Sequence, residues 1–437
     1  MNTELIFSWI LGAVIIIAFL IPYIKRMMKK EEKARERLKE TRSKGQEKAL
    51  MQHPIINQSA CIGCGICVDS CPEGDVLGLI NGKATVIHGS HCIGHGKCAE
   101  ACPLSAIEVG LGDISQRQDI PRLNEHFESN IPGLYVIGEL SGLALIRNAI
   151  EHGVKAVNHI ETSIAENHDN EFDIIIIGAG PSGLTSGLRA KELGLKYLII
   201  DQSEPGGTIL QYPRKKLVLV QPVSLPLYGQ LKKMEYPKEE LLEIWEDVIT
   251  KEALNLKTKQ KLLGIDQKNN GFIIHTNKGD ITANKVILGL GRRGTPRKLG
   301  VSGEDFGKVM YKLMDAETYK DQKILVAGGG DSAIEAAIGL SHQQGNDVTI
   351  SYRKSNFFRL KAKNEQRLKE AVSTGKLKVI FDSNLLEITE KEVHIDTQDG
   401  QKTILNDFVF IFAGGELPFP LLSAIGIDYG QNITISK

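Results

Sequence analysis

Two cysteine runs between residues 61 and 103 constrain this chain more than any other feature. The first reads CIGCGICVDSCP from residue 61, and the second reads CIGHGKCAEACP from residue 92. Cysteines at this spacing let one loop wrap three thiolates around an iron–sulfur cube, while the fourth cysteine of each run ligates the other cube. The runs therefore predict two clusters, one held by Cys61, Cys64, Cys67 and Cys102 and the other by Cys71, Cys92, Cys98 and the candidate ligand His95. Zinc and disulfide bonds are the alternatives, but zinc sites lack this doubled four-ligand frame.

The doubled frame resembles the bacterial two-cluster ferredoxin family over residues 53–110. Between the runs, VLGLINGKATVIHG predicts two short strands around an Asn81-Gly82 turn, which is the hairpin of such ferredoxins. His95 departs from the family pattern, and a neutral imidazole in place of a thiolate would raise the potential of its cluster. A three-iron cluster, or a four-iron cluster with an open corner beside His95, is the alternative.

Composition narrows the class of protein. The 437 residues carry no net charge, so no nucleic-acid-binding footprint is expected. All seven cysteines lie in the two runs, which leaves none for a disulfide bond or a second redox dithiol. Reduced thiolates with iron fit a reducing compartment.

The N-terminal residues 5–24 are apolar and uncharged, and about twenty such residues span a bilayer as a helix. Trp9 and Tyr23 stand near the two ends of this segment, and four cations follow it at once: Lys25, Arg26, Lys29 and Lys30. The positive-inside rule then predicts a single-pass anchor in the inner (cytoplasmic) membrane, with the other domains in the cytoplasm. A cleaved signal peptide is disfavoured because the charge lies on the wrong side. Residues 29–50 alternate in charge and predict a solvated helical spacer.

Residues 172–201 predict a strand, a glycine-rich turn, a helix and a second strand. The turn has the G-x-G-x-x-G spacing that brings backbone close to a pyrophosphate, and an acid that would bind a ribose follows about twenty residues later. This pattern resembles the FAD half of thioredoxin-reductase-like flavoproteins. The resemblance implies FAD contacts from the turn, the acid, the next glycine pair and the domain crossover: Gly178, Gly180, Gly183, Asp201, Gly206, Gly207, Gly289 and Gly291.

A second nucleotide motif begins at residue 323, with Gly328, Gly330 and Ala333 in the three motif positions. Where an NAD site carries an acid after the next strand, this chain has Arg353 and Lys354, with Arg359 nearby. Cations there suit the 2′-phosphate of NADPH, so NADPH is favoured over NADH. The alternative is a solvated basic turn that takes no part in nucleotide binding.

Residues 131–160 are out of place. The core IPGLYVIGELSG, followed by an amphipathic helix, resembles the last flavin-binding segment of the same flavoproteins, with Gly138 and Glu139 beside the flavin. That family has this segment at the C-terminus and usually has Asp in place of Glu139. Here the segment precedes the first nucleotide motif, and a circular permutation is the simplest explanation. An ordinary strand–helix connector is the alternative.

The predicted fold class is α/β, with two Rossmann-like domains, a small α+β two-cluster ferredoxin domain and a transmembrane helix. The predicted boundaries are 1–26 for the anchor, 27–52 for the charged linker, 53–110 for the ferredoxin, 111–171 for the permuted segment and its linker, 172–297 for the FAD domain, 298–412 for the NAD(P) domain and 413–437 for the return to the FAD domain.

The predicted function is a membrane-anchored, FAD-dependent NAD(P)H oxidoreductase, similar to dithiol-less ferredoxin–NADP reductases. Electrons from NADPH would pass through FAD to both clusters and then to an unknown protein or quinone, and no catalytic side chain is required. The alternatives are a disulfide reductase without its own dithiol, reverse electron flow and a nucleotide-binding redox sensor. The resemblance also leaves a homodimer open.

Overall fold

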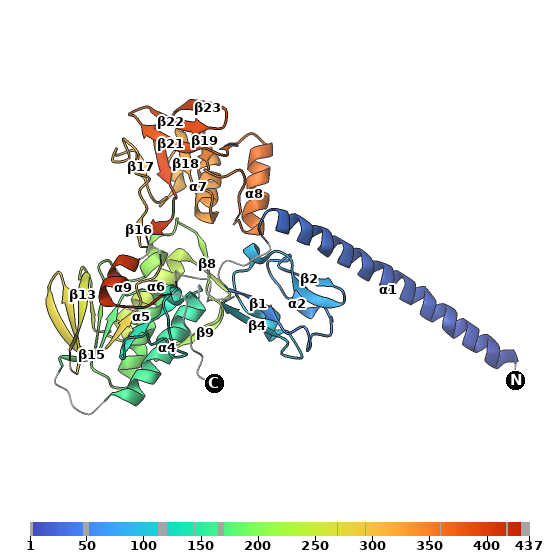
Figure 1. Cartoon of the computed structure of the whole chain (residues 1–437), viewed down its shortest axis with the longest axis horizontal. Helices are drawn as coiled ribbons and strands as arrows, with labels where there is room; N and C mark the ends of the chain where they lie inside the picture. The colour runs from blue at the N-terminus through green and yellow to red at the C-terminus, as the bar shows by residue number, and fades with distance from the viewer. Residues whose placement is uncertain are drawn as a thin grey trace. The chain divides into compact units, whose positions relative to one another are not determined.

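A computed structural model describes residues 3–46, 52–111, 120–142, 145–164, 170–268, 270–292, 294–358, 360–416 and 418–429. The chain divides into two compact units, and each is described here by itself (Figure 1). The first unit contains residues 1–112 together with residues 358–362. The second unit contains most of the remaining chain.

The first unit begins with one long helix, α1 (Thr3–Ser43). Its stretch from Trp9 onward is long and apolar enough to cross a membrane, judged by length and composition, and none of the apolar window is buried against protein. Apolar side chains such as Trp9 and Phe19 are at least three-quarters exposed. The helix continues without a break into the charged region that follows the apolar segment.

The charged half of α1 differs from the predicted solvated spacer, because one face of it packs on the hairpin of β2 (Leu77–Ile80) and β3 (Lys83–Val86). Ala34 is buried, and Thr41 donates a 2.7 Å hydrogen bond to the carbonyl of Ile87. Glu31 accepts a 2.9 Å hydrogen bond from the backbone of Asn81 at the hairpin turn. Positions 31, 34, 38 and 41 share one helical face, so the packing strip consists of Glu31, Ala34, Leu38 and Thr41, with one large apolar side chain.

The rest of the ferredoxin unit is small. Strands β1 (Gln52–Ile56) and β4 (Ile107–Leu111) pair antiparallel, and α2 (Ile66–Asp69), α3 (Lys97–Glu100) and the 3-10 turn η1 (Gly89–His91) carry the cysteine loops. Asn81 and Gly82 both have positive φ, at 53° and 68°, as the predicted hairpin turn requires.

The FAD half of the second unit is built on a seven-stranded sheet. Its order is β12 (Leu256–Lys257), β7 (Tyr197–Ile200), β6 (Phe172–Ile177), β15 (Gly279–Leu288), β14 (Gly271–Thr276) and β13 (Leu262–Lys268), with β5 (Leu134–Val136) also paired to β15. β6 is buried along its whole length, as expected for a parallel strand covered on both faces. The helices of this half are α4 (Ile146–Ser163), α5 (Pro181–Glu192) and α6 (Lys238–Lys251).

Short elements complete this half. β8 (Leu217–Leu219) pairs with β11 (Glu235–Pro237), and β9 (Val223–Leu225) pairs with β10 (Gly229–Leu231). The 3-10 turns η3 (Gly138–Ser141) and η4 (Gly207–Gln211) follow β5 and the loop after β7.

The nucleotide half has a five-stranded parallel sheet in the order β17 (Val309–Met310), β24 (Phe408–Ile411), β18 (Lys323–Ala327), β19 (Asp347–Ser351) and β20 (Leu377–Ile380). Helices α7 (Asp331–Ser341) and α8 (Ala362–Ser373), the 3-10 turn η5 (Ala316–Thr318) and an antiparallel sheet of β21 (Asn384–Ile388), β22 (Glu392–Thr397) and β23 (Gly400–Leu405) belong to it. The two chain crossings between the halves pair as β16 (Thr295–Pro296) and β25 (Gly415–Glu416), and α9 (Phe419–Ile425) follows. The predicted α/β class with two Rossmann-like halves is confirmed.

The segment that precedes the first nucleotide motif is part of the FAD-half sheet. β15 lies between β5 and β6 and pairs parallel with both. Val286 of β15, for example, is paired with Leu134 of β5 on one side and with Ile175 of β6 on the other. The start of this segment lies beside the end of the described chain: Pro121 forms a bridge with Tyr429, and Arg122 donates a 2.9 Å backbone hydrogen bond to Asp428.

Candidate functional site

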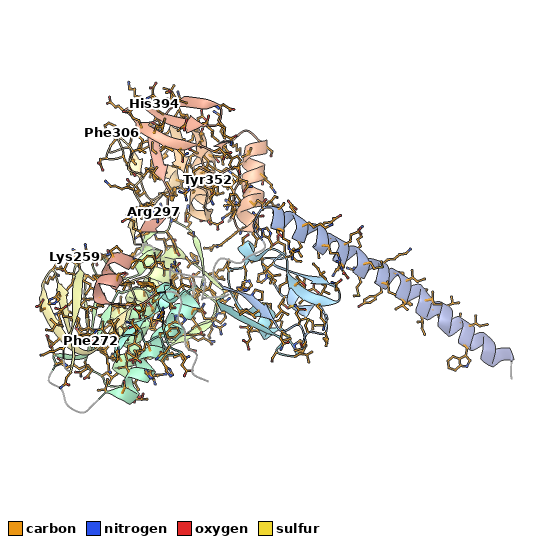
Figure 2. All side chains as sticks on the ribbon, in the orientation of Figure 1. Lys259, Phe272, Arg297, Phe306, Tyr352 and His394 are labelled. Atoms are coloured by element: carbon orange, nitrogen blue, oxygen red, sulfur yellow. The ribbon has the colours of Figure 1, made fainter. Side chains whose placement is uncertain are left out.

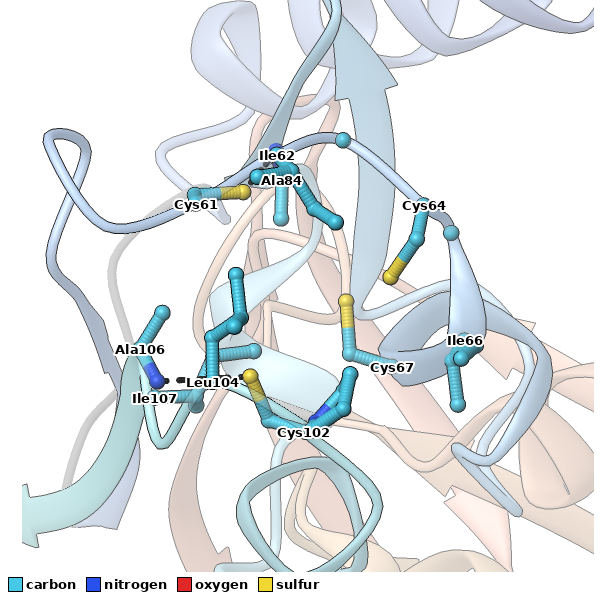
Figure 3. Close-up of a pocket in the computed structure, with 13 residues that line it drawn as sticks. Cys61, Ile62, Cys64, Ile66, Cys67, Ala84, Cys102, Leu104, Ala106 and Ile107 are labelled. Carbon is cyan, nitrogen blue, oxygen red and sulfur yellow. Dashed lines mark hydrogen bonds between the residues drawn. The ribbon is translucent and has the colours of Figure 1, made fainter.

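One pocket of the ferredoxin unit gathers four cysteines from both runs: Cys61, Cys64, Cys67 and Cys102 (Figure 3). These are the four residues predicted to hold cluster one. The loop turns through Gly63 and Gly65, which have φ of 71° and 80°. A Cβ at Gly63 would lie 1.9 Å from the carbonyl oxygen of Gly82, so only glycine fits this turn.

The spread of the sulfur atoms argues against zinc in this pocket. A tetrahedral zinc ion with Zn–S bonds near 2.3 Å would hold its sulfurs about 3.8 Å apart. Among the described residues, no three cysteine sulfurs lie within 4.8 Å of one another. A larger inorganic core that separates the thiolates fits this arrangement better.

Burial makes Cys67 a poor thiolate without a positive partner. Burial first, and then the neighbouring Cys61, Cys64 and Cys98, raise the pKa of Cys67 to about 11. Two backbone N–H groups donate to ligand sulfurs, from Ala84 to Cys61 at 3.4 Å and from Ala106 to Cys102 at 3.3 Å. Such N–H···S bonds stabilise the charge of a bound cluster and help set its potential.

Three of the predicted ligands of cluster two, Cys71, Cys92 and Cys98, lie close enough for their charges to interact. Burial first, and then the charges of Cys92 and Cys71, raise the pKa of Cys98 to about 11. His95 is buried, and its burial, followed by the charge of Lys97, lowers its pKa. A neutral imidazole at this position offers a lone pair to a metal.

The glycine-rich turn of the FAD half is tight at Gly178 and Gly183. Gly178 has φ of 110°, and a Cβ there would lie 2.4 Å from the carbonyl oxygen of Gly289. A Cβ at Gly183 would lie 1.8 Å from the carbonyl oxygen of Gly178, so helix α5 packs on the strand at glycine distance. The turn therefore has the close backbone approach that a pyrophosphate group needs at the N-terminus of α5.

Asp201 lies beside this turn. Its carboxylate accepts 2.7 Å hydrogen bonds from the backbone of Ala179 and of Ser203, and burial is the main cause that raises its pKa. The Gly206-Gly207 pair packs on the same turn, because a Cβ at Gly207 would lie 3.0 Å from Cα of Gly180.

Gly138 of the early segment and Gly289 of the crossover meet at the start of α5. A Cβ at either position would lie within 3.0 Å of Ser182 Oγ. Glu139 follows Gly138 in η3. The structure therefore brings Gly138, Gly289 and the glycine-rich turn together, whereas Gly291 lies one step further along the crossover, with φ of 65°. Sequence reasoning missed Ser182, although its place after the second motif glycine is a usable signal.

Helix α4 packs on α5 through Gly153. A Cβ there would lie 2.6 Å from the carbonyl oxygen of Ser182 and 2.9 Å from Ser186 Oγ. Because neither backbone can yield without moving a helix, Gly153→Ala is expected to lower the free energy of unfolding by about 1–3 kcal/mol and to weaken FAD retention. Gly307→Ala is the matched control, since a Cβ at Gly307 meets no atom within 4 Å. Denaturant unfolding of both variants measures the difference, and equal stabilities would contradict this packing.

The second nucleotide motif opens α7 as predicted. Gly328 has φ of 148°, Ala333 is buried, and a Cβ at Gly330 would meet no atom within 4 Å, which leaves room for a ligand. The ring of Tyr352, labelled in Figure 2, lies against Gly329.

Arg353 and Lys354 follow β19 and are exposed. Arg359, the third predicted cation, lies outside the described residues.

A strip of ion pairs between the two halves was not predicted. Arg214 pairs with Asp315 at 3.3 Å, Lys215 with Glu317 at 3.0 Å and Lys216 with Glu335 at 2.8 Å. The basic run was visible in the sequence, but its partners lie about one hundred residues away and follow no local pattern.

The chain matches two family models. Residues 175–435, more than half of the chain, match the pyridine nucleotide-disulphide oxidoreductase model, and residues 53–103 match a 4Fe-4S dicluster domain. The chain is 28% identical to bacilliredoxin reductase Bdr of Bacillus subtilis over 58% of this chain and 80% of that protein. It is 27% identical to a ferredoxin–NADP reductase of Ignicoccus hospitalis over 60% of this chain and 84% of that protein.

Among solved structures, the chain is similar to the bacillithiol disulfide reductase Bdr (YpdA) of Staphylococcus aureus. The TM-score is 0.55 at 28% identity, and the match covers 60% of this chain and 82% of that chain. The glycine-rich turns, the two nucleotide halves and the matched models agree. The chain belongs to the pyridine nucleotide-disulphide oxidoreductase family, as an FAD-dependent pyridine nucleotide oxidoreductase with a 4Fe-4S ferredoxin domain.

Proposed function

We propose that this protein is a membrane-anchored NADPH oxidoreductase that delivers single electrons to its two clusters and then to an external acceptor. The observation that carries the proposal is the distribution of cysteines. All seven lie between residues 61 and 102, so the flavin half has no dithiol of its own, and four of them line one cluster pocket.

Each part of the chain has a role in this proposal. Bound FAD would accept the hydride of NADPH, with both of its electrons, and release those electrons one at a time. The turn at Gly178–Gly183 would bind the pyrophosphate, and Asp201 the ribose. The cysteine loops would hold the clusters that take one electron each. The apolar part of α1 would anchor the chain in the cytoplasmic membrane, where a quinone or a membrane protein is within reach.

The test compares two kinds of acceptor in the anaerobically purified, cluster-loaded chain. NADPH should reduce a one-electron dye quickly and a small disulfide slowly. Cys64→Ser should slow electron transfer to the dye at least tenfold while NADPH still bleaches the flavin. Ser59→Ala, an exposed neighbour in the same loop, should behave like the wild type. Rapid disulfide reduction that survives Cys64→Ser would instead support a disulfide reductase, the activity in the name of the Staphylococcus aureus structure.

His95 tests the second cluster. We propose that it ligates the iron beside Cys92 and Cys98, because it is buried and its burial lowers its pKa, which favours the neutral imidazole. His95→Cys should then lower the potential of this cluster, since a negative thiolate replaces a neutral ligand. A redox titration followed by EPR measures the shift, and an unchanged potential would remove His95 from the ligand set.

We also propose that the FAD domain is circularly permuted. Three contacts support this. β5 completes the sheet beside β15, α4 packs on α5, and residues 121–122 lie against residues 428–429. The last contact is where a chain in the usual order would run directly from the end of α9 into the segment that carries β5.

A further inference from the structure

Asp75, His88 and His91 converge in the ferredoxin unit, and none of them belongs to the predicted cluster ligands. Among the described residues, they form the one group of three potential metal ligands whose donor atoms lie within 4.8 Å of one another. Asp75 lies in the loop that leads to β2, and the two histidines flank and end η1. The residues are 13 and 16 positions apart, so folding of the hairpin is what brings them together.

Both histidines contact the carboxylate of Asp75. His88 Nδ1 lies 3.1 Å from one oxygen of Asp75, and His91 Nδ1 lies 2.9 Å from the other. The two imidazole rings stack with their centroids 3.4 Å apart. His88 and His91 are 8% and 2% exposed, whereas the Asp75 side chain is 24% exposed. The carboxylate is therefore the side from which an ion could enter.

We propose that Asp75, His88 and His91 bind one divalent ion of the zinc class. Two imidazole nitrogens and a carboxylate oxygen are preferred zinc ligands, and bonds of about 2.0–2.1 Å place neighbouring donor atoms about 3.3 Å apart. The donor atoms of the three residues lie within 4.8 Å of one another, and each nitrogen is 2.9 or 3.1 Å from its own oxygen of Asp75, so modest side-chain shifts would bring them around one ion. Two nitrogens exclude magnesium and calcium as the preferred ions, because those ions favour oxygen ligands throughout.

The competing arrangement is a carboxylate that accepts an N–H from each imidazole. In that arrangement two N–H dipoles lie side by side on stacked rings and repel each other. A cation between the nitrogens replaces this repulsion by attraction, since both nitrogen lone pairs then face a positive charge. A water molecule at the exposed edge of Asp75 would complete a four-coordinate site.

The ion would join two loops that carry ligands of the second cluster. Asp75 lies four residues after Cys71, and His91 directly precedes Cys92. A bond network through the ion would fix these two loops to each other even when cluster two is absent. The ion would thus have a structural role, holding the loops of the second cluster together, and would take no part in electron transfer.

The test uses the full chain, purified anaerobically with its clusters and without added chelator. Metal analysis should find one zinc per chain, and zinc-edge X-ray absorption should show only nitrogen and oxygen neighbours at about 2.0–2.1 Å, without the 2.3 Å sulfur shell of zinc bound at a cluster site. Asp75→Asn and the double variant His88→Gln, His91→Gln should lose this zinc. His275→Gln is the control, because His275 also contacts two carboxylates, at 2.8 and 3.0 Å, but on an exposed sheet surface.

Three results would overturn the proposal. These are wild-type protein without zinc, zinc with sulfur neighbours only, and unchanged zinc content in Asp75→Asn. The absorption spectrum of the wild type decides the matter even if a variant fails to fold. Iron and sulfide content, measured on the same samples, shows whether loss of zinc also loosens cluster two. The proposed electron transfer is measured in a separate assay, so the failure of one proposal can be distinguished from the failure of the other.

Discussion

A chain that lacks residues 120–164 is expected to keep its iron–sulfur clusters and to lose FAD completely. The deletion removes β5 from its place beside β15 and removes α4, whose side chains Ile150, Val157 and Ile160 are fully buried. Loss of each such side chain from the core costs about 1.5–3 kcal/mol, and several together approach the whole stability of a domain, about 5–15 kcal/mol. Gly138, which lies beside Ser182 at the start of α5, disappears as well.

The matched control is the same segment in a different place. A chain in which residues 120–164 follow residue 429 through a short glycine linker should bind FAD like the wild type. The contact between Pro121 and Tyr429 is what makes a short linker sufficient. Flavin absorbance and iron content of the three proteins provide the comparison. FAD binding by the deletion protein, or its absence from the rearranged protein, would contradict the permutation.

Local motifs made the nucleotide sites and the cysteine loops predictable. The glycines at 178 and 183 are needed because backbone atoms of neighbouring elements come closer than a Cβ allows, and such a need leaves a fixed spacing in the sequence. The same holds for the cysteine runs, where one short loop gathers three ligands.

Partners that are distant in sequence were harder to predict. A strand at 134–138 was expected in the sheet that contains 173–177. The observed strand, 134–136, lies in that sheet, but its hydrogen bonds go to β15. The residues of the strand indicate only that it is buried. Which strand it pairs with depends on the arrangement of the whole sheet. The charged half of α1 looked solvated because its packing face carries only one large apolar side chain, Leu38, beside Ala34 and Thr41. Asp75, His88 and His91 could not be predicted as a group, because they belong to no recognisable sequence motif.

Removal of both cations after β19, in the variant Arg353→Ala, Lys354→Ala, is expected to raise the KM for NADPH about a hundredfold and to leave the KM for NADH almost unchanged. Only NADPH carries the 2′-phosphate, and a charge-assisted hydrogen bond contributes about 1.5–3 kcal/mol. Two such bonds in a solvent-exposed turn amount to at least the 2.7 kcal/mol that a hundredfold change requires. Both residues are exposed at the carboxyl end of a parallel strand, where ligands of such sheets bind.

The control variant for this prediction keeps the net charge change and moves it to the other end of the sheet. Lys320 and Lys376 are exposed and precede β18 and β20, so Lys320→Ala, Lys376→Ala removes two cations at the amino ends of the strands. This variant should bind both nucleotides like the wild type, because phosphate recognition depends on position and only weakly on total charge at physiological ionic strength. Steady-state kinetics with NADPH and NADH at one salt concentration make the comparison. Equal losses for the two nucleotides in the Arg353, Lys354 variant would show that the turn supports the fold and does not read the 2′-phosphate.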